Sequence, residues 1–492
     1  MIQNNSILIQ RTTIPQWFNN QSLMLFFTAF GVCTVAFGYA MFLRYALVAI
    51  VSVLLFFVGG RHYFVQWSRM SEKKFLENVF LIGFVVRFAW VCYCFFYFNP
   101  TYYDGAVYGD GADVSWYMPA GEAIAEWIRN PELYTYDSFH HKWQAAVDDL
   151  GYPIWLGIVN VLTFGISDVF VPMIVKCFVG ALCARFIYKV GVRHFGEDVG
   201  RVAAIFTALY PNMFYWCGTM FKESEMVFLV CAFVNEMDKA LGDNVKLTFK
   251  TLLPATLIGM SLFLFRSALG LVAFAAVMAH VVLASQRIIS LGKKLIAGVL
   301  VTFVLLVGMG EGLRQRITDT VETVQSDSQK KNMEWRANRK DDSGRTNKFA
   351  KYAGAAVFAP LIVTIPFPTF NMANEGNIRQ MEMSGGSFIK NILSFFVIFV
   401  LFNMLFSGEW RRHVFIIAFM LGYMACLALR QFAQSGRFHM PIIPMITLFG
   451  AYGLSIVQNN KKWKRYWSMF LVVEFVFCVG WNWFKLKGRG MI

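Results

Sequence analysis

One apolar run decides the fold class. Residues 76–98 read LENVFLIGFVVRFAWVCYCFFYF, with only two charged side chains, Glu77 and Arg87. A helix needs about 20 mostly apolar residues to cross the hydrocarbon core of a bilayer. The run is therefore predicted to be a membrane-spanning helix, and runs of the same kind recur along the chain.

The composition extends this prediction to the whole protein. Of 492 residues, 57% are hydrophobic and 15% are charged, whereas soluble domains have about 25% charged residues. The net charge of +15 comes largely from Lys and Arg in short loops between apolar runs, where these residues set topology and contact anionic lipid. We expect an all-α polytopic membrane protein surrounded by lipid bilayer, with no nucleic-acid partner.

The nine cysteines point in the same direction. Nearly all of them fall inside apolar runs, and no two form a CxxC pair. Cysteines in such positions are predicted to be small buried hydrophobic residues, not disulfides or metal ligands.

About thirteen runs are predicted to span the membrane. They are residues 23–42, 45–59, 76–98, 169–190, 202–217, 225–241, 251–265, 268–285, 295–309, 388–406, 413–429, 438–457 and 466–484. Residues 152–165 form a shorter run that is predicted to be re-entrant or tilted. Residues 353–370 are interrupted by three prolines and are predicted to be interfacial or re-entrant.

The basic loops predict the orientation. Clusters of Lys and Arg fall on one side of the membrane if residues 152–165 do not span it, and that side should be the cytoplasm. The N-terminus is then cytoplasmic. We expect four regions: residues 1–75 with two extra spans, a core of residues 76–309 with an acidic outer loop at 99–150, an outer loop and re-entrant segment at 310–387, and C-terminal spans at 388–492.

The acidic outer loop holds the most unusual stretch, Tyr108-Gly-Asp110-Gly-Ala-Asp113-Val-Ser-Trp-Tyr117. Carboxylates beside a bilayer are costly and therefore indicate a site. Residues 114–128 are predicted to form an amphipathic surface helix, with Trp116, Tyr117, Ala120, Ile124 and Trp127 or Ile128 on its apolar side.

Other charged residues should share this membrane depth. They precede or follow predicted spans at the outer face: Lys222, Glu223, Arg266, Arg430 and Arg437. A carboxylate can deprotonate a hydroxyl nucleophile, and arginine binds phosphate in a bidentate, permanently charged way. Together these groups fit an enzyme that takes a lipid-phosphate substrate from within the bilayer.

The chain from about residue 76 resembles the GT-C superfamily of membrane glycosyltransferases, especially the protein mannosyltransferase and lipid A aminoarabinose transferase type. The resemblance rests on four motifs, of which the first is Asp113 four residues before Tyr117 and the second runs from Gly151-Tyr152-Pro153 to Phe164-Gly165-Ile166-Ser167. The third motif consists of His194-Phe195-Gly196, Arg201-Val202-Ala203-Ala204, Leu209-Tyr210-Pro211 and Glu223-Ser224-Glu225. The fourth runs from Gly436-Arg437-Phe438 through Pro441 and Pro444 to Ala451-Tyr452-Gly453-Leu454. The chain departs from the family pattern by its two extra N-terminal runs and by Asp110-Gly-Ala-Asp113 in place of a paired acidic dipeptide.

The resemblance implies inverting transfer of a sugar from a polyprenyl-phosphate donor to a lipid, glycan or protein acceptor on the extracytoplasmic face of a membrane. Because the sequence shows no eukaryotic luminal repeat or retention signal, we expect that membrane to be a bacterial inner membrane. The resemblance gives Asp113, or else Asp110, the role of general base or acceptor-orienting group, and Glu223 that of a second acidic group. The substrate-binding residues would be Arg437, Arg266, Lys222, Arg430, Tyr117 and Tyr152. No cofactor is expected, and a divalent metal is not favoured.

Other interpretations remain open at this point. Asp113 could be only the N-cap of the surface helix, and Arg437 could be an interfacial anchor. The closest rival activity is a polymerase or ligase of undecaprenyl-diphosphate-linked oligosaccharide, for which the arginines of residues 310–352 are suitable. A transporter or flippase is disfavoured because few charges lie within the runs, Arg87, Lys176 and Glu474 among them.

Overall fold

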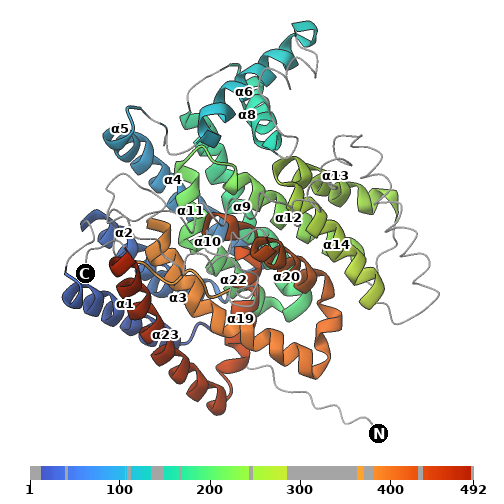
Figure 1. The fold of residues 1–492 in the computed structure, drawn as a ribbon. Coiled ribbons are helices and arrows are strands. Elements are labelled where there is room, and N and C mark those ends of the chain that lie inside the picture. The colour runs from blue at the N-terminus through green and yellow to red at the C-terminus, as the bar shows by residue number, and fades with distance from the viewer. Residues whose placement is uncertain are drawn as a thin grey trace.

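The computed structural model describes residues 13–38, 43–105, 107, 112–133, 149–165, 169–242, 248–284, 363–370, 381–429 and 436–488. All regular elements in these ranges are helical, and none is a strand (Figure 1). The helices relevant here are α1 (Gln16–Ala36), α2 (Leu43–Leu54), α4 (Glu72–Tyr93), α6 (Ala112–Arg129), α8 (Gly151–Leu162), α9 (Phe170–Phe195), α10 (Glu197–Leu209), α11 (Pro211–Tyr215), α12 (Glu223–Leu241), α13 (Phe249–Phe265), α14 (Ser267–Leu283), α19 (Ser387–Ser407), α20 (Val414–Leu429), α21 (Gly436–His439), α22 (Ile443–Val457) and α23 (Lys461–Gly488).

Six helical segments in the described ranges are long and apolar enough to cross a membrane: Leu43–Trp67, Glu72–Tyr102, Phe170–Phe195, Glu382–Ser407, Gly436–Val457 and Lys461–Lys487. Short π-helical segments lie within the first two, η1 (Leu55–Gly59) and η2 (Cys94–Phe98), and a third, η7 (Glu382–Gly386), begins the segment Glu382–Ser407. Apolar helices of 10–17 residues lie at Gly151–Leu162, Lys250–Phe265, Ser267–Leu283 and Val414–Ala428. The polytopic helical prediction is confirmed, whereas the predicted total of thirteen spans is not. The predicted span at 295–309 lies outside the described residues.

The predicted span at 202–217 is wrong as one helix. α10 ends at Leu209, Tyr210 is extended, and Pro211 begins the short helix α11, followed by the 3₁₀ turn η5 (Trp216–Gly218). Proline has no N–H to donate and is well suited to the first turn of a new helix. The break turns the chain toward the start of α12.

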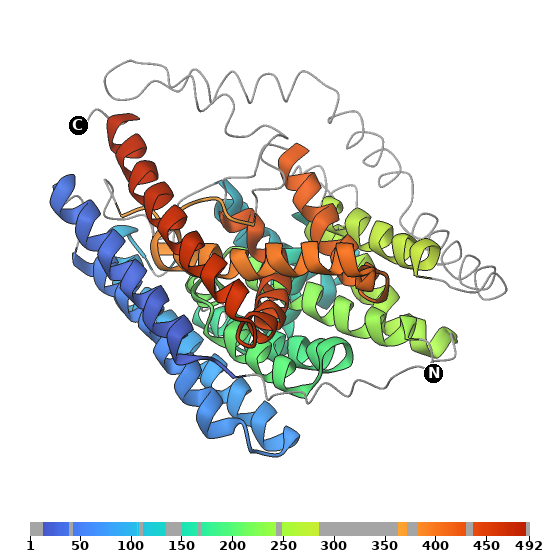
Figure 2. The same cartoon turned by 90° about the horizontal axis from the view of Figure 1, so that it is seen from below.

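α9 lies at the centre of the bundle. It packs against α4, α10, α12 and α22. The backbones of α9 and α10 approach each other where Gly191 faces Gly200, because a Cβ added to Gly191 would lie 2.8 Å from the Gly200 Cα. Farther out, α23 runs beside α1, red beside blue in Figure 2. All nine cysteines are free, and seven of them are buried, as the sequence predicts.

The helix predicted over residues 114–128 is confirmed as α6, which packs against α8 at one end of the bundle, at the top of Figure 1. Tyr117, Ala120 and Ile124 form its buried side, whereas Trp127 and Ile128 are 42% and 43% exposed. α8 has only 12 residues, too few to cross a bilayer, in accord with the prediction for residues 152–165.

Candidate functional site

A polar cavity of about 260 Å³ lies at the end of the bundle where α6, α12 and α14 begin and α13 and α20 end. It is lined by Asp113, Asp149, Lys222, Arg266, Ala268, Tyr423, Cys426, Leu427, Arg437 and Phe438. Segments from residue 113 to residue 438 therefore contribute side chains to one place.

Arg437 has the most extensive contacts in this cavity. Its Nε donates to Oε1 of Glu223 at 2.5 Å, and its Nη2 donates to Oδ2 of Asp113 at 2.9 Å. The guanidinium also lies 4.1 Å from the centre of the Phe221 ring. Glu223 is fully buried, whereas the Asp113 side chain is 44% exposed. Arg437 is thus fixed from the interior by one carboxylate and covered from the open side by another.

Arg266 is the second arginine of the cavity and is the single residue between α13 and α14. Its Nη1 donates to the Tyr423 hydroxyl at 2.7 Å, and its Nη2 lies 3.8 Å from the same Glu223 oxygen that Arg437 contacts. The guanidinium is 4.5 Å from the centre of the Phe438 ring. Glu223 therefore places the two guanidinium groups side by side.

Lys222 supplies the third cation, from the residue just before α12, and forms an ion pair with Asp149. Lys222 is buried, and Asp149 is 39% exposed. Burial lowers the pKa of the Lys222 ammonium below its usual value, while the charge of Asp149 opposes this shift. A negatively charged ligand beside Lys222 would favour the ammonium form in the same way as Asp149 does.

Tyr117 and Tyr152 lie behind the lining and do not face the cavity. Their rings meet edge to face with centroids 5.1 Å apart, and both side chains are buried. Burial raises the pKa of the Tyr117 hydroxyl, and the charges of Asp149 and Asp113 add to the effect. The two tyrosines join α6 to α8. The family resemblance assigns them to substrate binding, but in this structure neither side chain lines the cavity.

The structure brings together most of the residues selected from sequence. Asp113, Lys222, Arg266 and Arg437 line the cavity, and Glu223 closes it from the inside. Asp110 and Arg430 lie outside the described residues. Asp113 is the second residue of α6, not its N-cap, and its carboxylate bonds to Arg437.

Sequence reasoning missed Asp149, Tyr423 and Phe438 as lining residues. Asp149 is one of many acids in the outer loop, and only its position two residues before the start of α8 distinguishes it. Tyr423 lies within an apolar helix, where a single tyrosine gives no signal of its own.

Three cations and three carboxylates meet at the cavity and form ion pairs with one another. The cations are Lys222, Arg266 and Arg437, and the carboxylates are Asp113, Asp149 and Glu223. The two carboxylates on the open side are each at least 39% exposed, whereas the cations and Glu223 are at most 11% exposed. Exposed ion pairs contribute little free energy, so an incoming anion can replace either outer carboxylate while the inner pairs remain. Within the described ranges, no three His, Cys, Asp or Glu side chains are grouped as a metal site.

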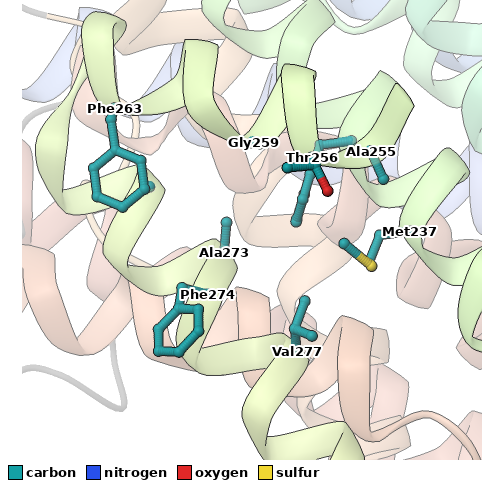
Figure 3. Close-up of a pocket in the computed structure, with 10 residues that line it drawn as sticks. Met237, Ala255, Thr256, Gly259, Phe263, Ala273, Phe274 and Val277 are labelled. Carbon is teal, nitrogen blue, oxygen red and sulfur yellow. The ribbon is translucent and has the colours of Figure 1, made fainter. Parts of the chain in front are cut away.

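A second cavity, between α12, α13 and α14, is apolar and small (Figure 3). Its volume is about 20 Å³, and it is lined by residues such as Met237, Phe263 and Val277. A space of that size holds about one water-sized group. Its lining lacks ionisable side chains, so it offers no acid, base or charged ligand-binding group.

No family model, curated protein or solved structure matches this chain. The fold and the cavity define the class: an α-helical protein with several helices suited to crossing a membrane and with a charged cavity at one end of the bundle. Its function has to be argued from the side chains of that cavity.

Proposed function

We propose that the protein is an integral membrane glycosyltransferase with a GT-C-like core. It transfers a sugar from a polyprenyl-phosphate donor to a lipid, glycan or protein acceptor, with inversion at the anomeric carbon. In this proposal the N-terminus is cytoplasmic, and the cavity faces the extracytoplasmic side of a bacterial inner membrane.

The observation that carries the proposal is the placement of Arg437 between buried Glu223 and exposed Asp113, with Arg266 and Lys222 lining the same cavity. Arginine matches the geometry of a phosphate group. A cluster of three cations at one end of a membrane bundle suits a phosphate whose lipid chain stays in the bilayer.

The donor phosphate binds to Arg437, Arg266 and Lys222 and displaces Asp113 from Arg437. Because Glu223 holds the other edge of Arg437, the guanidinium keeps its place during the exchange. The displaced carboxylate is then free to accept a proton. Donor binding and release of the base are coupled in this way.

The reaction is a single displacement. Asp113 removes the proton from the acceptor hydroxyl, and the acceptor oxygen forms a bond to the anomeric carbon on the face opposite the phosphate. The bond between the anomeric carbon and the phosphate oxygen breaks, and its electron pair stays on that oxygen. The arginines stabilise the charge that develops on the leaving phosphate.

The proposal is tested with purified protein in lipid nanodiscs and a panel of radiolabelled polyprenyl-phosphate monosaccharides. A bacterial membrane lipid extract supplies the acceptors. We expect label transfer with one donor in wild type and loss of at least about 99% of the rate in Arg437→Ala, the usual range for losing one charged transition-state contact. Lys250→Ala, an exposed cation on α13 outside the cavity, should retain the wild-type rate.

Two other results would count against the proposal. Equal transfer by wild type and Arg437→Ala would remove the cavity from the reaction. Absence of transfer with every monosaccharide donor, together with elongation of undecaprenyl-diphosphate-linked oligosaccharide, would identify the rival polymerase or ligase activity.

A further inference from the structure

An ion pair lies deeper in the bundle, behind the cavity. Lys176 on α9 donates from Nζ to Oε2 of Glu225 on α12 at 3.0 Å, and the two side chains are 0% and 1% exposed. Lys176 is within the candidate span Phe170–Phe195. Neither residue lines the cavity.

A pair of this kind is costly. Two charges removed from water lose several kcal/mol of hydration each, and apolar side chains of similar volume are often as stable or more stable in their place. Ionisable residues inside membrane helices accordingly tend to have a function. Oε1 of Glu225 makes no hydrogen bond with any described residue, so the pair is not optimised for stability alone.

The further contacts of Lys176 lead to both walls of the cavity. Its Nζ also donates to the backbone carbonyl of Phe221, directly before Lys222 and Glu223. The Phe221 ring lies against Arg437. One ammonium group thus holds the turn that presents three of the site's groups.

The other wall is reached through aromatic rings. Lys176 Nζ lies 4.7 Å from the centre of the Tyr152 ring, on α8. Tyr152 packs edge to face on Tyr117, one helical turn after Asp113 on α6. Lys176 therefore contacts the turn before α12 directly and the α6–α8 pair through Tyr152.

We infer that the Lys176–Glu225 pair is a positioning element of the donor site, which sets the Phe221–Lys222–Glu223 turn so that Arg437 and Lys222 face the phosphate together. The inference rests on the proposed function, because it concerns binding of that phosphate. Lys176 and Glu225 act through the residues that they hold and do not touch the substrate.

The double variant Lys176→Met/Glu225→Met separates positioning from stability. Removing both charges leaves no unpaired ion, and Met has a volume close to that of either side chain, so the variant should fold with a wild-type melting temperature. Undecaprenyl phosphate should nevertheless bind about tenfold more weakly or worse, the effect of losing one well-aligned charged contact. Binding of uncharged undecaprenol should not change.

The measurement is titration of both lipids into protein in detergent, followed by native mass spectrometry, with thermal melts of each variant. Glu474→Gln is the matched control: Glu474 is 3% exposed and bonded to Asn391, on α23, which packs on α1, α19 and α22. It should bind both lipids as wild type does.

Each outcome has a separate meaning. Wild-type affinity for undecaprenyl phosphate in the folded double variant would overturn the positioning role. If Arg437→Ala still binds undecaprenyl phosphate weakly in the same experiment, the proposed function stands. Equal weakening toward both lipids with a lower melting temperature would show a structural role only and also overturn the inference. Wild type that does not distinguish the phosphate from the alcohol would remove the proposed function and this inference with it.

Discussion

Glu223 Oε1 accepts a hydrogen bond from Arg437 Nε at 2.5 Å across 214 residues of sequence. The same oxygen lies 3.8 Å from Arg266. A fully buried carboxylate thus determines where two guanidinium groups stand, and the open side of the cavity is left to Asp113 and Asp149. The inner acid should therefore matter chiefly for stability, and the outer acids for exchange with an anionic ligand.

Glu223→Gln should destabilise the protein. The change removes the buried countercharge of Arg437 and Arg266, and breaking a buried pair from one side typically costs about 3–5 kcal/mol. Unfolding in detergent, followed by tryptophan fluorescence, should show a clearly lower midpoint. In Glu223→Gln/Arg437→Gln part of the stability should return, and a double variant no more stable than Glu223→Gln would contradict the pairing.

Asp113→Asn, unlike Glu223→Gln, should leave the stability of the protein nearly unchanged. Its carboxylate is 44% exposed, so loss of the pair should change stability by about 1 kcal/mol or less. Binding of undecaprenyl phosphate should be unchanged or tighter because a competing anion is gone. Glu122→Gln, an exposed acid on the same helix, is the control. Weaker phosphate binding in Asp113→Asn would contradict the displacement step.

Lys222→Met should weaken undecaprenyl phosphate binding by about tenfold, the value of one charged contact. The difference in affinity between wild type and Lys222→Met should become smaller as salt is raised, because added ions screen the attraction between Lys222 and the phosphate. Titrations at low and high salt check this result. Since Asp149 competes for the same ammonium, Asp149→Asn should not weaken binding, and an equal loss in both variants would mean that the ion pair itself is needed.

The buried histidine His413 should contribute to the pH dependence of stability. His413 lies just before α20, at the opposite end of the bundle, with its Nδ1 2.8 Å from Nδ1 of His194, which contacts Asp238. Burial lowers the pKa of His413 to about 4, and the charges of His194 and Arg412 contribute to the shift. The unfolded chain, with a His pKa near 6.5, therefore binds more protons between these values.

Stability should accordingly be full above about pH 6.5 and fall as the pH drops toward about 4. Melting temperatures measured from pH 8 to pH 4 should decline less steeply in His413→Gln than in wild type. His62→Gln, at an exposed histidine on α3 (Gly60–Trp67), should retain the wild-type slope. Parallel curves for wild type and His413→Gln would contradict the buried neutral state.

The sequence predicted helices well where apolar runs were long and uninterrupted. The run at 76–98 became the candidate span Glu72–Tyr102, and the run at 388–406 became part of Glu382–Ser407. It failed at 202–217, because Pro211 is compatible with the first turn of a new helix and the apolar pattern continues through the break. Apolar content alone does not reveal such a break.

For the candidate site, unusual charges at predicted span ends were informative. Arg266 and Arg437 stood out because arginine is costly beside a bilayer. Asp149 did not stand out, since its partner Lys222 lies 73 residues away and pairing across helices is set by packing. The Lys176–Glu225 link was hidden for the same reason: a charge within an apolar run does not identify the carbonyl that it holds.

The role of Asp113 as the base is measured by single-turnover sugar transfer by Asp113→Asn with the donor already bound. We expect this variant to bind the active polyprenyl-phosphate donor at least as tightly as wild type, to melt within about 2 °C of it, and to transfer no detectable label. Normal transfer by Asp113→Asn would contradict the proposed mechanism, because the carboxylate opposite Arg437 would then have no part in the reaction.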